Sequence, residues 1–594
     1  MALRTPTRQF WLYPVVASVL TAVIGCQGAA PPAAQKQAAP AQATSAPAAQ
    51  PAQKAEPSAA APAASGPVTP KVNRLVMGVG TIGIESNDPT VISPPETWQL
   101  RPMYENLLGV DPEGKEPVPQ LATSYSLEPD GFSYRFQLRK GVQFHNGFGE
   151  MTAKDVRFAW ERMVSAESKH PHTSYWKSVV KDVEIVNDYE VVFRLTGPDA
   201  DFITSASGAE AVLPIYSKAD ADSRPNFPTI TDKPIAGTGP YQFLERAQSQ
   251  YIRFQRVPYQ HWRVTPDFPE FEYRLTRELS TRIAQLKARE IQIAGLPPEM
   301  IGQAEGPGYK IIKSRAAGLQ SFLTWHGVYP SPQIRPEERP AVDPTQPFVY
   351  MDTPLLDSRV RQALNKAVNR DEFNRAFFRG IGETIYLFGF KEDRPGWNPE
   401  WKARFPDMYG YDPAKARALL AEAGYGPSNP LKTNIILVST AYFAASGDMS
   451  EALSGYWRSI GVDVNLITMD GNSRTTQSRQ REFNNHGEVV GSSVRQLRGW
   501  GIYGTHTAMG TQSGAALPEV DDVFDKEVRK TVDPSKVDAT WRKMGDLAYD
   551  RFMNVPLHWV PAEAVVDSNV VADYVFPGTI TGLYTHPEYV KAAP

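Results

Sequence analysis

The stretch from Pro119 to Met163 reads PQLATSYSLEPDGFSYRFQLRKGVQFHNGFGEMTAKDVRFAWERM. In its middle, apolar side chains at positions 132, 134, 136 and 138 alternate with polar ones at 133, 135, 137 and 139. This alternation is typical of a strand that buries one face, and Pro129-Asp130-Gly131 predicts a turn before it. From position 156, apolar residues recur at the spacing of a helix, and Thr152 with Asp155 predicts a capping box at its start.

The residue types at fixed positions in this stretch are more specific to one family than its apolar and polar periodicity. The pattern P-x-L-A-x-S, D-G-x-x-Y-x-F-x-L-R-x-G-V-x-F-H-x-G and T-A-x-D-V resembles the signature of bacterial extracellular solute-binding proteins of family 5. These are receptors of ABC importers for peptides, opines, sugars or nickel. The signature positions include Gly131, Tyr134, Phe136, Arg139, Gly141, Phe144 and His145. A second landmark of the family, GTGPY, matches Gly237, Gly239, Pro240 and Tyr241 around Thr238.

The resemblance implies an α/β fold, the type II periplasmic-binding-protein fold, in three parts around a central cleft. Domain I would be discontinuous and take 71–103, 229–322 and 556–594. Domain II would take 104–228 and domain III 323–555. The alternation of helical and strand patterns along the chain independently favours an α/β protein.

Local patterns predict several elements within these domains. A hairpin is expected over 180–195, and 102–108 resembles the family's Tyr-Glu-x-Leu helix. Helices are expected after Asp357, from Asp412 to Gly424, and from Met449 to Gly461, because apolar residues recur there at helical spacing.

The first residues predict export. Arg4 and Arg8 precede a short apolar run that ends in Val23-Ile24-Gly25-Cys26, which resembles a lipobox, and Cys26 is the only cysteine. We therefore expect a lipoprotein signal over 1–26 with lipidation at Cys26; the alternative is an ordinary secretory signal with an incidental cysteine. Residues 27–70 are nearly all Ala, Pro, Gln, Ser and Gly, a composition that predicts a disordered tether.

Composition and motifs argue against several other functions. A net charge of −3 does not favour nucleic acid as a partner. The nine histidines form no metal-binding motif, and the close pair His170 and His172 is more typical of a solvated loop. No nucleophile elbow or phosphate-binding loop is present, so we expect no enzyme activity, no catalytic residue, no metal and no cofactor.

The resemblance also points to residues for solute binding. The strand LQSFLTWH ends in Trp325 and His326, where the family usually has an aromatic residue followed by Asn. Gly499-Trp500 resembles the family's Gly-Trp at the mouth of the cleft, and Arg498 and Tyr503 lie beside it. These five residues are candidate ligand contacts. For Trp325 and Trp500 the alternative is buried packing between domain elements.

One departure from the family concerns the ligand. Peptide-binding members place an Asp shortly after this Trp to hold the α-ammonium group, whereas residues 495–518, RQLRGWGIYGTHTAMGTQSGAALP, contain no carboxylate. A buried ammonium group without a counter-charge would cost several kcal/mol. We therefore expect a neutral or anionic ligand, or one held by backbone and stacking, such as a sugar or a modified peptide.

Together these patterns predict a monomeric solute-binding lipoprotein on the outer face of the cytoplasmic membrane. Its partners would be a small polar or peptide-like solute and an ABC permease with cytoplasmic ATPases. A sensory receptor of the same fold is the alternative function.

Overall fold

The structure is a computed structural model that describes residues 69–92, 94–115, 117–209, 213–227, 233–328, 353–438, 445–479, 482–492, 495–501, 515, 517–578 and 585–594. The expected signal, Cys26 and nearly all of the tether lie outside these residues, as does Tyr503. Residues Ser65 to Pro594 form one compact unit. In the described residues, no helix combines the length and the apolar character needed to cross a membrane.

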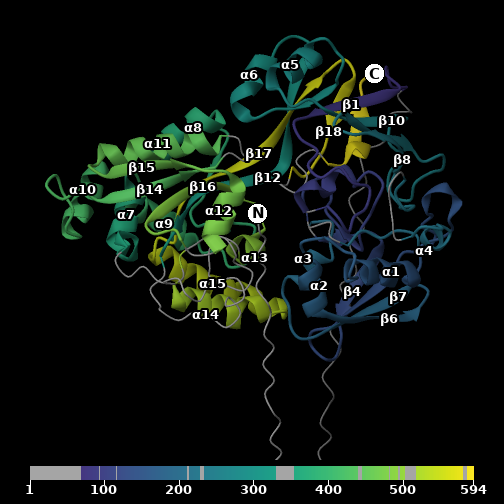
Figure 1. The fold of residues 1–594 in the computed structure, drawn as a ribbon, viewed down its shortest axis with the longest axis horizontal. Coiled ribbons are helices and arrows are strands. Elements are labelled where there is room, and N and C mark those ends of the chain that lie inside the picture. Colours follow the sequence, from purple (N-terminus) through teal and green to yellow (C-terminus); the bar gives the residue numbers. More distant parts are fainter. Residues whose placement is uncertain are drawn as a thin grey trace, which may run out of the picture. The chain divides into compact units, whose positions relative to one another are not determined.

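An eleven-stranded mixed sheet connects most of the described chain (Figure 1). Its order is β15 (Asp463–Thr468), β14 (Lys432–Leu437), β16 (His486–Ser492), β12 (Tyr309–His326), β17 (Asn554–Asp567), β11 (Ile293–Gly295), β1 (Arg74–Val79), β10 (Glu270–Leu275), β9 (Tyr251–Arg256) and β8 (Tyr241–Ala247), with β13 (Glu383–Thr384) paired to β17. The long strands β12 and β17 are antiparallel neighbours and occupy the middle of this order.

The signature stretch forms part of a separate four-stranded sheet. Its order is β4 (Ala122–Leu127), β5 (Tyr134–Leu138), β7 (Glu190–Leu195) and β6 (Val180–Asn187). The helix α1 (Ala153–Met163) packs against β6 and β7, and the Asp155 carboxylate accepts hydrogen bonds from the Thr152 backbone and hydroxyl at 2.9 and 3.1 Å. The predicted strand, hairpin and capping box are therefore confirmed.

Two further pairs of short strands complete the sheets of the described chain: β2 (Leu108–Gly109) with β3 (Val118–Pro119), and β18 (Val571–Tyr574) with β19 (Val590–Ala592). The remaining α-helices are α2 (Thr173–Val179), α3 (Phe202–Ser205), α4 (Lys218–Asp222), α5 (Leu279–Lys287), α6 (Ile301–Ala304), α7 (Ser358–Lys366), α8 (Arg370–Phe378), α9 (Pro399–Met408), α10 (Pro413–Glu422), α11 (Ser446–Ser459), α12 (Gly471–Arg479), α13 (Gln496–Gly499), α14 (Pro518–Lys526) and α15 (Pro534–Asp550).

The helices predicted in the second half of the chain are confirmed. The Asp412 side chain caps α10 by accepting from the backbone N–H of Lys415 at 2.9 Å, and Gly424 follows with a φ of +92°. Gly461 ends α11 in the same conformation, which glycine adopts without steric cost.

The helix predicted over 102–108 is wrong. Residues there form a turn, a bridge between Glu105 and Ile215, and the start of β2. The physical reason is that this backbone bonds to distant segments: Ile215 N–H donates to Glu105 O at 2.9 Å and Gly208 N–H to Leu108 O at 2.7 Å. Tertiary pairing outweighs the local helical preference.

Buried apolar side chains gather into two large cores. The first takes its members from 75–293 and 562–592, and it includes residues of both the predicted domain I and the predicted domain II. The second takes its members from 322–560, within or beside the predicted domain III. We call them the first and second cores. The strands β12 and β17 contribute to both. The exact domain boundaries stay a prediction.

Candidate functional site

Trp325 lies on the face of β12 that points into the second core. Its side chain is 0% exposed, its indole N–H donates to Phe552 O at 2.9 Å, and its ring stacks on Trp457 with centroids 6.0 Å apart. This is the environment that the packing alternative expects. Protein covers the Trp325 side chain completely in this structure. Its contact with a solute therefore stays a prediction.

His326 follows on the opposite face of β12, where it meets a buried ion pair. Its Nε2 lies 3.0 Å from Glu488 Oε2 on β16, and Arg474 Nε of α12 donates to the same oxygen at 2.8 Å. We call His326, Arg474 and Glu488 the face cluster. Burial alone would raise the pKa of Glu488, but the Arg474 charge and the His326 hydrogen bond outweigh it and hold the pKa below its ordinary value.

Trp500 follows α13 and is also fully buried. Its ring centroid lies 5.6 Å from that of Phe388 and 5.9 Å from that of Phe390, within the second core. Gly389 sits against the indole with a φ of +79°, and a Cβ there would come within 2.6 Å of Trp500 Nε1. Arg498 belongs to α13, but its side chain lies outside the described residues. A solute-binding role for these two residues and for Tyr503 stays a prediction.

The signature residues have structural roles. Gly131 and Gly141 adopt φ values of +80° and +78°, while Tyr134, Phe136 and Phe144 lie in the first core. The Arg139 guanidinium donates to Gln120 O at 3.1 Å and lies 4.3 Å from the centre of the Trp262 ring.

The two landmarks contact each other. His145 N–H donates to Gly237 O at 2.9 Å, and His145 Nε2 lies 2.8 Å from Gly239 O. A Cβ at Gly237 would lie 2.0 Å from Met103 O and one at Gly239 2.4 Å from Pro102 O, so only glycine permits this close approach. Pro240 continues this turn, and the Tyr241 hydroxyl donates to Phe268 O at 3.1 Å.

A second buried ion cluster joins three distant segments, and sequence reasoning missed it. Arg263 Nε donates to Glu105 Oε1 at 3.0 Å, and Arg263 Nη1 donates to Glu588 Oε1 at 2.9 Å. The Trp262 indole N–H donates to Glu105 at 3.1 Å, and His261 Nε2 lies 3.7 Å from it. We call Glu105, His261, Arg263 and Glu588 the seam cluster. Glu105 stands in the Tyr-Glu-x-Leu motif, but nothing in the sequence pointed to its partners.

The seam cluster strongly favours the ionised form of Glu105. Burial raises the pKa of Glu105, yet the nearby His261 and the charge of Arg263 outweigh this and lower the pKa to about 2. Nearby, burial lowers the pKa of His586 to about 4, and His586 Nε2 lies 3.0 Å from Val110 O. His586 is therefore neutral at pH 7.

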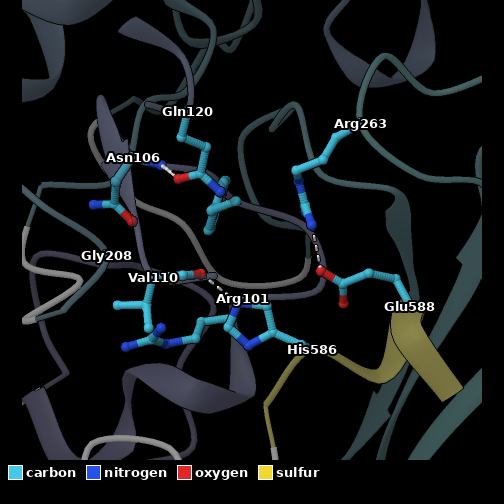
Figure 2. A pocket seen from close by; sticks show the side chains of 9 residues that line it. Arg101, Asn106, Val110, Gln120, Gly208, Arg263, His586 and Glu588 are labelled. Atoms are coloured by element: carbon cyan, nitrogen blue, oxygen red, sulfur yellow. Dashed lines mark hydrogen bonds and ion pairs between the residues drawn. The ribbon is translucent and has the colours of Figure 1, made fainter. Parts of the chain in front are cut away.

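Figure 2 shows a small cavity beside the seam cluster, into which Glu588 and Arg263 project from different segments. Its lining includes Arg101, Asn106, Gln120, Arg263, His586 and Glu588. Its volume of about 20 Å³ is the room of one water molecule and far below that of a solute site. The described residues contain no group of three or more His, Cys, Asp or Glu side chains suited to a metal ion.

Residues 116–490 match the family model described as bacterial extracellular solute-binding proteins, family 5 Middle. The chain belongs to this family. Members of family 5 are extracellular solute-binding proteins and not enzymes, so solute binding is the role that membership supports. The signature and GTGPY resemblances are thereby confirmed at the level of the family.

Relatives and solved structures agree with this membership. The chain is 26% identical over 391 residues to a dipeptide-binding protein of Escherichia coli strain K12, covering 62% of this chain and 66% of that one. It is 28% identical over 385 residues to the oligopeptide-binding protein AppA of Bacillus subtilis strain 168, covering 63% and 65%. In both, the chain matches slightly less than two thirds of the relative's length.

Among solved structures, NikA from Brucella suis in complex with Fe(III)-EDTA superposes with a TM-score of 0.70 at 19% identity, covering 88% of this chain and 100% of that one. At this identity the likeness concerns the fold alone. The expected type II periplasmic-binding-protein fold of family 5 is confirmed.

Proposed function

We propose that this chain is the solute-capturing lipoprotein of an ABC importer. In this proposal Cys26 carries the lipid anchor, residues 27–70 form the tether, and the folded body closes on a polar or peptide-like solute and delivers it to a permease. The observation that carries the proposal is the match of residues 116–490 to family 5. The division of the described body into two cores joined by β12 and β17 supports the closing motion.

The charges on the β12 face support a ligand without a free α-ammonium group. Residues 495–518 contain no carboxylate. Among the described residues, Glu488 is a carboxylate on this face, and it is already bonded to Arg474 and His326. A buried ligand ammonium would need a carboxylate that is not already paired, because an uncompensated buried charge is costly.

Native mass spectrometry of the protein purified from its own cells tests solute capture directly. We expect a retained small molecule whose mass is unchanged on release, because the members of family 5 are solute-binding proteins. Release of a chemically altered molecule would contradict the proposal and point to an enzyme.

The charge argument has its own test. Calorimetric titration with alanyl-alanine and with N-acetyl-alanyl-alanine should show no preference for the free amine. Micromolar binding of the free peptide that is lost on acetylation would refute the argument about the ligand, while leaving solute capture intact.

Lipid anchoring is tested by labelling cells with radioactive palmitate. The wild-type protein should incorporate label, and the Cys26→Ser variant should not. Equal labelling of both would show that Cys26 is not the anchor.

A further inference from the structure

The strand β4 is one edge of the four-stranded sheet, and its outer side is open. Its one neighbour in the sheet order is β5, and residues 123–127 are all exposed. Among the described residues, the backbone of 123–127 is hydrogen-bonded to no segment other than β5. Such an edge presents N–H and C=O groups that a further strand can pair with.

The usual protection of an edge strand is missing from β4. Exposed edges are normally kept from pairing by charged residues, by proline or by a covering element. The other strands that end the two larger sheets, β6, β8 and β15, each contain at least one charged residue. The sequence of β4, ATSYSL, contains neither a charged residue nor a proline. It is therefore the edge of these two sheets that is best suited to accept another strand.

Two apolar side chains of β4 continue the row of the sheet's covered face. Tyr125 pairs with Phe136 of β5 and Leu127 with Tyr134, and opposed residues of antiparallel strands share a face. The rings of Tyr134 and Phe136 belong to the first core and lie against Phe202 of α3. Tyr125 and Leu127 remain 43% and 41% exposed. A further strand would cover them if it carried apolar residues at alternate positions.

The chain itself offers one strand of this kind, which is β4 of a second copy. The tether does not offer one, because residues 27–67 contain no Val, Ile, Leu, Met or aromatic residue and are interrupted by prolines. A second β4 is uncharged and carries Tyr125 and Leu127 at alternate positions. Two identical edges that pair antiparallel are related by a two-fold axis, so the contact closes as a dimer.

The faces of the two sheets fix the register of such a pair. Opposed residues must lie on the same face, so residues of equal parity face each other. An axis through Tyr125 pairs all five exposed residues: Tyr125 faces its own copy, Ser124 faces Ser126, and Thr123 faces Leu127. No charged residue then opposes another, and the exposed apolar side chains of both copies come together.

We propose that two copies of this chain pair antiparallel through β4 about a two-fold axis at Tyr125, which joins their four-stranded sheets into one continuous sheet. This inference goes beyond the proposed function, because solute capture does not depend on it. The contact uses one short strand from each copy, so the dimer should be weak and should form only at high protein concentration. The chain would then be in equilibrium between the monomer that we expected from its sequence and this dimer.

The experiment is sedimentation velocity of the full chain carrying Cys26→Ser over a range of concentrations. We expect the sedimentation coefficient to rise with concentration. The double variants Ser124→Lys with Ser126→Lys, and Ser124→Glu with Ser126→Glu, each place like charges opposite one another twice. Each alone should raise the dissociation constant of the dimer at least about tenfold. An equal mixture of the two should restore the dimer, because opposite charges then face each other.

Val186→Lys is the matched control for an added charge. Val186 lies on β6, the other edge of the same sheet, and is 43% exposed, as Tyr125 is. It lies outside the proposed contact, so Val186→Lys should leave the dissociation constant unchanged. A loss of the dimer in Val186→Lys equal to that in the double variants would place the contact elsewhere and overturn the inference.

Several other results would overturn it. A protein that sediments as a monomer up to its solubility limit, a dimer that persists in both double variants, or a mixture that fails to restore the dimer would each do so. If the double variants do not fold, hydrogen exchange of the Cys26→Ser chain decides: the amides of 123–127 must exchange more slowly in concentrated than in dilute protein. Protection that is already complete in dilute protein would mean that another segment of the chain covers β4. Retention of a solute is measured separately, so the dimer and the proposed function can fail independently.

Discussion

The seam cluster and the face cluster both bury a glutamate beside an arginine and a histidine, but they differ in charge and in origin. In the seam cluster, Arg263 lies between two carboxylates, Glu105 and Glu588. In the face cluster, Arg474 and His326 both contact the one carboxylate of Glu488. The seam cluster draws on three distant segments, whereas the face cluster belongs to one end of the large sheet.

The charges of the two clusters bear on different properties of the protein: those of the seam cluster on stability, and those of the face cluster on solute binding. Because Glu105 and Glu588 both bond to Arg263, the seam cluster depends on Arg263, and the cavity beside it has the room of one water molecule. In the face cluster Arg474 compensates the charge of Glu488, so Glu488 offers no unpaired negative charge to a cationic solute. Glu105, Glu588 and Glu488 are each bonded to an arginine, and all three are buried acids of the kind that attracts a functional interpretation.

The largest expected effect is from Arg263→Met. Its loss removes the guanidinium that the buried carboxylates of Glu105 and Glu588 both contact, and we expect the free energy of unfolding to fall by about 3 to 5 kcal/mol. Arg474→Met, the matched change in the face cluster, should cost about 2 kcal/mol, because one carboxylate remains and His326 still contacts it. Urea unfolding monitored by circular dichroism measures both. Equal losses would break the distinction between the clusters.

The next effect is the dependence of stability on acid. The folded pKa of Glu105 is about 2 against an ordinary value of 4.5, so its contribution is present above pH 4.5 and is lost as the pH falls toward 2. By linkage this contribution is about 3 kcal/mol. Glu105→Gln should flatten the decline of unfolding free energy below pH 4.5, and Glu488→Gln should flatten it less. Urea unfolding curves measured between pH 5 and 3 test this order of effects. A flatter decline of the unfolding free energy in Glu488→Gln than in Glu105→Gln would contradict the expected difference between the two clusters.

A separate acid effect belongs to the buried histidines. Burial lowers the pKa of His145 and of His586 to about 4 from 6.5, so the stability they contribute is present above pH 6.5 and is lost as the pH falls to about 4. We expect wild type and Glu105→Gln to lose stability in parallel between pH 6.5 and 5. If the unfolding free energies of the two proteins diverge in that range, the pKa of Glu105 is higher than its surroundings indicate.

The smallest expected effect is from the histidine partners. His326→Asn removes one hydrogen bond from Glu488 but leaves Arg474, which predicts a loss of about 1 kcal/mol. His261→Asn should lower the free energy of unfolding by about as much. It removes the hydrogen bond between His261 Nε2 and Thr238 O, which is 2.8 Å long, whereas Glu105 lies farther away at 3.7 Å. Solute retained by His326→Asn in native mass spectrometry should match wild type; loss of solute without loss of stability would make His326 a ligand contact after all.

The sequence by itself determined the family, the fold class and most local elements. The alternation in β5, the capping box of α1 and the Asp412 and Gly424 ends of α10 are local signals, because each depends on neighbouring residues and on backbone conformation. Only the tertiary structure decided how 102–108 pairs, which face of β12 carries Trp325, and that Glu105 meets Arg263 and Glu588. Those outcomes depend on contacts between residues far apart in the chain, whose energies exceed local preferences and leave no periodic pattern in a single sequence.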